Sequence, residues 1–194
     1  MTKRKNVDDV TSNIPGSDGQ SRKYGMSTLA VHAGARPDPV TGARGTPIYQ
    51  TTSFVFDDAE HGAELFNLQT FGYVYSRMTN PTVSVFEERV AQLEGGRGAV
   101  ATSSGHAAQF IAAATLMEAG DEFIASRNLY GGSVTQFGVS FPKLGWKCNF
   151  VDPTDPANFE KAMNDKVKFI FCEGVANPGG IILDLEKIAD IAHK

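Results

Sequence analysis

Apolar positions near the middle of the chain follow helical spacing. Phe86, Val90 and Leu93 lie three or four residues apart, so they share one face of a helix. Asn80 and the proline after it are typical of a helix start: asparagine caps free N–H groups, and proline at the first helical position loses no hydrogen bond. Gly95 is typical of a helix end. The pattern therefore predicts a helix that begins at Asn80 and ends before Gly95.

The rest of the chain alternates between short apolar runs, which predict strands, and helical spacing, which predicts helices. Because the two alternate, the sequence predicts an α/β domain with a mainly parallel sheet. In such sheets ligands bind in loops at the carboxyl ends of the strands. The predicted strands are 98–102, 122–125, 148–151 and 167–172, and the predicted helices are 103–118, 132–144, 156–163 and 185–193.

The N-terminal part of the chain has a different composition. Residues 1–24 are mostly polar, and such a segment buries too little surface to offset its ordering entropy, so we expect a disordered tail. Residues 25–79 are rich in Pro, Gly and Thr and predict an extended arm, with one short helix around 58–66. Long irregular segments are uncommon inside compact domains. We therefore expect the arm to contact a neighbouring subunit and residues 80–194 to form the first part of the α/β domain.

Composition and charge exclude several classes of protein. The 194 residues carry a net charge of −4, which does not favour nucleic acid or an anionic membrane. The sequence has neither an apolar run of the roughly 20 residues that span a bilayer nor a secretory signal, so we expect a cytoplasmic protein. Cys148 and Cys172 predict two reduced, buried thiols. The four histidines lack metal-ligand spacing, so no metal site is expected.

The segment Thr-Ser-Ser-Gly-His-Ala-Ala at 102–108 joins a predicted strand to a predicted helix. Gly105 lets a ligand approach the backbone closely. The free N–H groups of the first turn and the positive end of the helix dipole suit a phosphate group. An ordinary serine-capped helix is the better explanation of this motif when it is taken alone.

Three further motifs carry candidate site residues. Tyr75 and Arg77 lie two residues apart in a segment expected to be extended, so they point the same way and offer donors to a phosphate. Tyr130, before two glycines, can lay its ring on a planar ligand. Glu173 ends an apolar strand and Asn177 begins an Asn-Pro turn. Taken singly, these motifs also fit a solvated arginine beside a packed tyrosine, a turn with a core tyrosine, and a carboxylate facing solvent.

The order of the motifs is more specific than any one of them. Tyr-x-Arg before a helix, then Ser-Gly, then Tyr-Gly-Gly, then Glu-x-x-x-Asn-Pro resembles the Cys/Met-metabolism family of pyridoxal-phosphate (PLP) enzymes. The segment Thr-Pro-Ile-Tyr-Gln-Thr-Thr-Ser-Phe at 46–54 is also similar to this family, and the resemblance covers residues 27–194. It implies the N-terminal half of an aspartate-aminotransferase-like (fold type I) large domain, preceded by an arm.

The resemblance also implies roles for the candidate residues. The family holds PLP at the C-terminal edge of its sheet, in a homo-oligomer that is commonly a dimer of dimers. By similarity, the active site is shared, because the Tyr-x-Arg segment reaches the phosphate of the neighbouring subunit. The implied cofactor-binding residues are Gly105 and His106 at the phosphate, Tyr130 on the pyridine ring, Tyr75 and Arg77 on the neighbour's phosphate, Asn177 near the phenolic oxygen, and Glu173 in support.

Within the family, His106 and the long segment 56–72 favour the O-acetylhomoserine sulfhydrylase branch. This branch implies γ-replacement on O-acetyl-L-homoserine by sulfide or a thiol, which gives homocysteine or methionine. Cystathionine γ-synthase, methionine γ-lyase and O-succinylhomoserine sulfhydrylase remain alternatives. In the family the Schiff-base lysine, the aspartate on the pyridine nitrogen and the substrate-binding arginine follow the region that matches these 194 residues. No lysine present matches, so we assign no catalytic residue, and a catalytically incompetent piece of such an enzyme is the other hypothesis.

Overall fold

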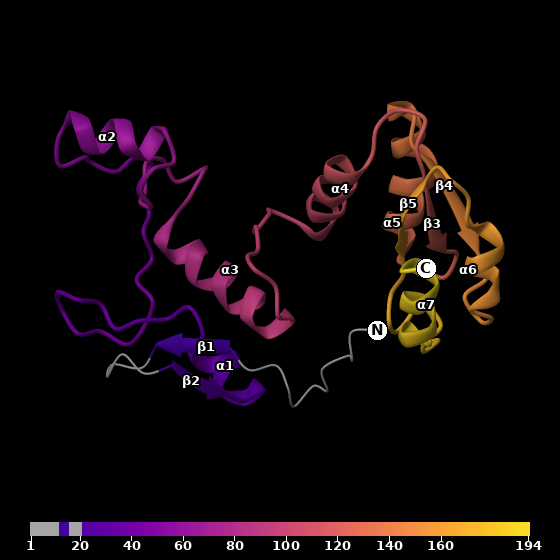
Figure 1. The fold of residues 1–194 in the computed structure, drawn as a ribbon, viewed down its shortest axis with the longest axis horizontal. Helices are drawn as coiled ribbons and strands as arrows, with labels where there is room; N and C mark the ends of the chain where they lie inside the picture. The colour runs from indigo at the N-terminus through magenta and orange to yellow at the C-terminus, as the bar shows by residue number, and fades with distance from the viewer. Residues whose placement is uncertain (1–11, 16–20) are drawn as a thin grey trace. The chain divides into compact units, whose positions relative to one another are not determined.

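A computed structural model describes residues 12–15 and 21–194, which fall into two units, residues 1–101 and 102–194 (Figure 1). No described helix has the length and apolar character needed to cross a bilayer. In the first unit the elements are β1 (Ser12–Pro15), β2 (Ser21–Tyr24), α1 (Met26–His32), α2 (Ala59–Phe66) and α3 (Pro81–Glu94).

Helix α3 confirms the predicted helix that begins at Asn80 and ends before Gly95. The Asn80 side chain accepts a hydrogen bond from the Thr82 N–H, and Pro81 occupies the first helical position. Gly95 then adopts the left-handed conformation, with φ 68°, and its N–H donates to the carbonyls of Ala91 and Gln92 in the last turn. Helix α2 confirms the expected short helix, with the Asp58 side chain as its cap.

Helix α1 was not predicted, because its sequence carries no capping side chain before Met26. It forms by packing on α3: Leu29 is fully buried, and Arg89 Nε donates to the Ala33 carbonyl at 2.9 Å. This contact is the reason that α3, which the sequence placed with the α/β domain, belongs to the first unit.

The expected tail at 1–24 falls largely outside the described residues. Its described part is paired: β1 and β2 form an antiparallel ladder in which Ser12 lies opposite Tyr24. Antiparallel pairing uses backbone hydrogen bonds, which a polar composition does not prevent.

The second unit confirms the α/β prediction. Its parallel sheet has the strand order β4-β3-β5, formed by β3 (Glu122–Ser126), β4 (Lys147–Val151) and β5 (Val167–Phe171). The predicted helix at 132–144 is helical throughout but changes its hydrogen-bond spacing twice. The helical elements are α4 (Gly105–Leu116), α5 (Gly131–Thr135), the π-helix η2 (Gln136–Ser140), the 3₁₀-helix η3 (Phe141–Leu144), α6 (Ala157–Ala162) and α7 (Leu185–Ala192).

The predicted strand at 98–102 is wrong. These residues belong to neither described sheet, and Val100 is 77% exposed. The Ala101 N–H donates to Glu87 Oε1 at 2.8 Å rather than to a neighbouring strand. An apolar run becomes a strand only where another strand accepts its hydrogen bonds, and the described residues provide none here.

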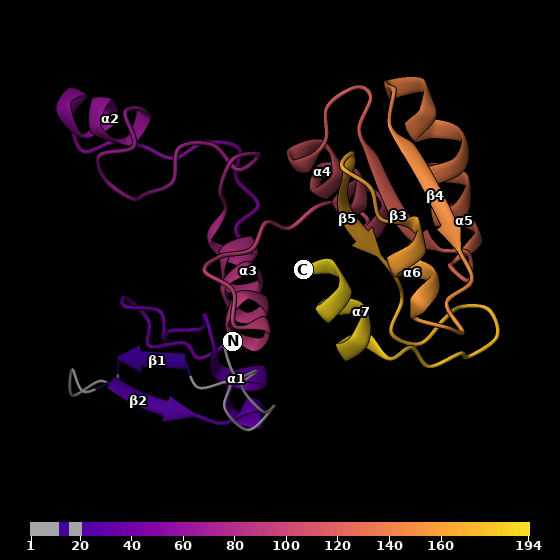
Figure 2. The ribbon, with the colours of Figure 1, turned by 45° about the vertical axis from the view of Figure 1, so that its right-hand side comes forward.

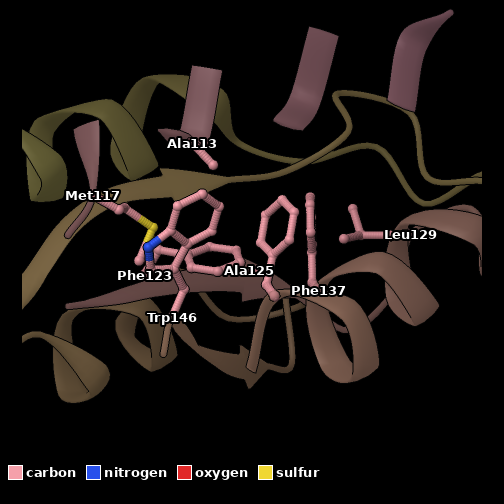
Figure 3. Packing of buried hydrophobic residues seen from close by; sticks show 8 residues of the cluster. Ala113, Met117, Phe123, Ala125, Leu129, Phe137 and Trp146 are labelled. Atoms are coloured by element: carbon pink, nitrogen blue, oxygen red, sulfur yellow. The ribbon is translucent and has the colours of Figure 1, made fainter. Parts of the chain in front are cut away.

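Strand β3 separates two apolar clusters on opposite faces of the sheet. Phe123 and Ala125 pack on one side against α4, Phe137 and Trp146, as the close view in Figure 3 shows. Ile124 points the other way and packs against α6 and α7. The two ribbon views agree that helices cover the sheet on both sides (Figure 2). This rigid centre fixes the loops that leave the carboxyl ends of β3 and β5.

The two cysteines are free, as expected, but they are half-buried rather than buried. Burial among apolar neighbours still raises the pKa of Cys148 to about 12 and raises the pKa of Cys172. Both thiols are therefore neutral at physiological pH and are poor nucleophiles.

Candidate functional site

Two loops at the carboxyl edge of the sheet are joined by one carboxylate. Glu173 follows β5, and its Oε1 accepts the Tyr130 N–H at 2.9 Å, in the loop that follows β3. Its Oε2 accepts the Asn177 N–H, also at 2.9 Å. Three residues that the sequence singled out therefore lie together, at the edge where α/β sheets bind ligands.

The ring of Tyr130 lies against the ring of His106. Their centroids are 5.8 Å apart and their planes are inclined by 31°. Gly132 makes this approach possible, because a Cβ atom there would lie only 2.5 Å from His106 Cε1 and 2.6 Å from Tyr130 Cε1. The Tyr130 side chain is 53% exposed, so one face of its ring remains open to a ligand.

The first turn of α4 contains main-chain N–H groups without a hydrogen-bond acceptor among the described residues. Ser104 Oγ accepts the Ala107 N–H at 3.1 Å, whereas the N–H groups of Gly105 and His106 have no acceptor among the described residues. No atom approaches within 4 Å of the position that a Cβ would occupy at Gly105. Two free N–H groups at the positive end of a 12-residue helix, next to open space, suit an anionic group.

Buried polar atoms beside α4 also lack partners. Gln136 Nε2 donates to the His106 carbonyl at 3.0 Å and so ties α4 to η2. Gln136 Oε1 and His106 Nε2 are buried without a hydrogen-bond partner among the described residues. Unpaired buried atoms are rare in proteins and point to a water or a ligand.

Tyr75 and Arg77 form a second group, in the first unit. The Arg77 guanidinium carbon lies 5.4 Å from the centre of the Tyr75 ring, so the two side chains do point the same way. The backbone differs from the expectation, because residues 76–78 form a turn rather than an extended segment. Within the turn the Met78 N–H donates to the Tyr75 carbonyl at 2.9 Å.

Asn80 holds this turn in place, a role that its prediction as a helix cap did not include. Besides capping α3, its Nδ2 donates to the Tyr49 carbonyl at 2.9 Å and to Ser76 Oγ at 3.0 Å. The adjacent Thr82 hydroxyl donates to the Pro47 carbonyl at 2.7 Å and accepts the Tyr49 N–H at 2.9 Å. The 46–54 segment, singled out from the sequence, is thus fixed to the start of α3.

Neither Gln136 nor the distinct part played by Gly132 could be predicted from the sequence. The glycine doublet at 131–132 was a signal for close approach, but the sequence does not show which side chain approaches. Gln136 carried no signal, because its partner is a main-chain carbonyl.

The sequence profile of the Cys/Met metabolism PLP-dependent enzyme family matches residues 27–194. The chain belongs to this family. It is 47% identical over 180 residues to an O-acetyl-L-homoserine sulfhydrylase of Leptospira meyeri, covering 93% of this chain and 41% of that protein. It is 47% identical over 168 residues to a homocysteine synthase of Schizosaccharomyces pombe, covering 87% of this chain and 39% of that protein.

Solved structures of the family agree with the fold. A putative O-acetylhomoserine (thiol)-lyase of Campylobacter jejuni, which carries N'-pyridoxyl-lysine-5'-monophosphate, matches with a TM-score of 0.83 and 36% identity, over 88% of this chain and 42% of that one. The α/β unit is therefore the N-terminal half of a fold type I large domain, as the resemblance implied. The chain spans about two fifths of the length of the curated relatives it matches.

Proposed function

We propose that these residues belong to a PLP-dependent O-acetylhomoserine sulfhydrylase, in which they form the phosphate-binding and ring-stacking side of the cofactor site. The observation that carries this proposal is the pair of free N–H groups at Gly105 and His106 beside the cluster of His106, Tyr130, Glu173 and Asn177. The relatives named above support the choice of substrate.

The residues present fit PLP. Gly105 and His106 would donate N–H groups to its phosphate, and Tyr130 would stack on its ring. Asn177, whose main-chain N–H binds the same carboxylate as that of Tyr130, would lie near the phenolic oxygen. When bound, PLP supplies the electron sink for loss of the substrate's Cα proton and γ-acetoxy group. No lysine among these 194 residues matches the family's Schiff-base segment, so we assign that chemistry to the full-length protein.

We also propose that the full-length protein is a cytoplasmic homo-oligomer, a dimer of dimers whose arm, residues 25–79, contacts a neighbour. In this assembly Tyr75 and Arg77 bind the phosphate of the neighbouring subunit. The large exposed apolar side chains of the first unit support a partner surface there, since large exposed apolar patches mark interaction sites.

The test is an assay of the full-length protein with PLP and sulfide. We expect homocysteine from O-acetylhomoserine, with a higher kcat/KM than from O-succinylhomoserine. Cystathionine formed from cysteine, or methionine split without a sulfur donor, would assign the protein to the synthase or γ-lyase branch instead. Absence of PLP binding would overturn the proposal.

A further inference from the structure

The contacts of Glu173 leave neither of its carboxylate oxygens without a protein partner. Oε1 accepts the N–H of Tyr130 and Oε2 accepts the N–H of Asn177, both at 2.9 Å. These donors are main-chain groups in two loops that leave adjacent parallel strands, β3 and β5. One side chain therefore sets the distance between two loops that are 47 residues apart in sequence, from Tyr130 to Asn177.

Tyr130 depends on this contact more than on its own side chain. Its phenol has no hydrogen-bond partner among the described residues, and its position at the start of α5 has no side-chain cap. The ring touches only His106 among the described aromatic groups, through the space left by Gly132. The hydrogen bond from the Tyr130 N–H to Glu173 therefore holds the Tyr130 backbone, and with it the Cα atom from which the ring extends.

We propose that Glu173 is a positioning residue, which holds the stacking ring of Tyr130 and the amide of Asn177 at a fixed separation and does not itself touch the cofactor. This inference rests on the proposed function, because it concerns how the PLP site is shaped. It also narrows the role that the resemblance gave to Glu173, from general support to one geometric task.

The task requires two acceptors at the end of a side chain of this length. An ionised carboxylate has two oxygens that accept, whereas the amide of glutamine has one acceptor and one donor. Glu173→Gln therefore keeps the size of the side chain and loses one of the two contacts. Glu173→Asp keeps the charge but is one methylene shorter, so it cannot reach both loops.

The experiment compares wild type, Glu173→Gln, Glu173→Asp and a control, Glu118→Gln, in the full-length protein. Glu118 is an exposed carboxylate of the same unit whose side chain has no hydrogen bond among the described residues. Hydrogen–deuterium exchange by mass spectrometry follows the peptides that contain Tyr130 and Asn177, without PLP. PLP dissociation constants and the induced circular dichroism of bound PLP report the shape of the site.

We expect one or both peptides to exchange faster in Glu173→Gln and Glu173→Asp than in wild type. In Glu118→Gln the exchange rates of both peptides should match those of wild type. We also expect roughly tenfold weaker PLP binding and an altered induced dichroism, since a hydrogen bond to a charged group is lost. The inference would be overturned if Glu173→Gln showed the exchange, PLP affinity and dichroism of wild type. It would also be overturned if Glu173→Asp matched wild type in all three measurements, because that result would indicate a role for the charge alone. If wild type does not bind PLP, the proposed function fails, while the exchange data still decide whether Glu173 joins the loops.

Discussion

The two units are stabilised in different ways. In residues 102–194 a sheet is buried between two apolar clusters, with Phe123 and Ile124 fully buried on opposite faces. In the described part of residues 1–101 few large apolar side chains are buried, and Val55, Leu68 and Phe71 are at least 90% exposed. That unit relies on directional hydrogen bonds from Asn80 and on helix caps. The α/β unit thus carries its own core, whereas the arm carries a surface that a partner subunit covers in the proposed assembly.

The largest difference between the units should appear on removing an aromatic ring. Phe123→Ala deletes a fully buried ring that stacks on Phe169 at 4.7 Å, so the free energy of unfolding should fall by about 3–5 kcal/mol. Phe71→Ala, at an exposed ring of the arm, should change the free energy of unfolding of the unassociated 194-residue chain by less than about 0.5 kcal/mol. Urea unfolding followed by tryptophan fluorescence measures both. Equal losses would show that the arm is packed as tightly as the sheet.

Asn80 tests whether polar contacts hold the arm. Asn80→Ala removes a helix cap and the two hydrogen bonds donated to the Tyr49 carbonyl and to Ser76 Oγ, so the free energy of unfolding should fall by about 2 kcal/mol. Thr79→Ala is the control, because the neighbouring Thr79 side chain is exposed and makes no hydrogen bond among the described residues. The same urea titration applies. A loss no larger than that of the control would mean that Asn80 does not fix the turn.

A substitution at Arg77 should affect PLP binding without affecting the stability of the fold. Arg77 is exposed and contacts Tyr75 alone among the described residues, so Arg77→Ala should leave the unfolding midpoint unchanged. PLP binding to the full-length protein should weaken about tenfold, because a charged phosphate contact is lost. Equilibrium dialysis measures the affinity, with Arg97→Ala as the control. Unchanged PLP affinity would remove Arg77 from the cofactor site.

A smaller effect is the loss of unfolding free energy in acid, which involves Glu122 at the amino-terminal edge of the sheet. Hydrogen bonds from Asn149, Lys147 and Asn164 lower the pKa of Glu122 to about 2 from 4.5. Because the folded pKa is lower than the unfolded one, this stabilisation is complete above pH 4.5 and is lost as the pH falls toward 2. Unfolding free energies of wild type should therefore decline across this window more steeply than those of Glu122→Gln. Parallel curves would contradict the assignment.

Much of the fold could be predicted from the sequence, because local chemistry decides it. Asn80, Pro81 and Gly95 define α3, and apolar runs define the three strands. Helix α1 and residues 98–102 were misjudged because their conformations depend on tertiary partners: α3 for one, and a neighbouring strand for the other.

The order of the motifs predicts which residues make up the candidate site, but it does not predict the contacts between them. Glu173 binds main-chain N–H groups, which nearly every residue possesses, so no residue type in the sequence marks Tyr130 and Asn177 as its partners. The fit of His106 against Tyr130 likewise depends on an absent Cβ at Gly132, whose neighbour only the folded chain reveals.

The most direct test of the central claim is a structure of the full-length protein with PLP. The account predicts that the phosphate accepts the N–H groups of Gly105 and His106 and that the Tyr130 ring stacks on the pyridine ring. Glu173 should still bind the main-chain N–H groups of Tyr130 and Asn177. A phosphate bound away from the start of α4, or a Tyr130 ring turned away from the cofactor, would contradict it.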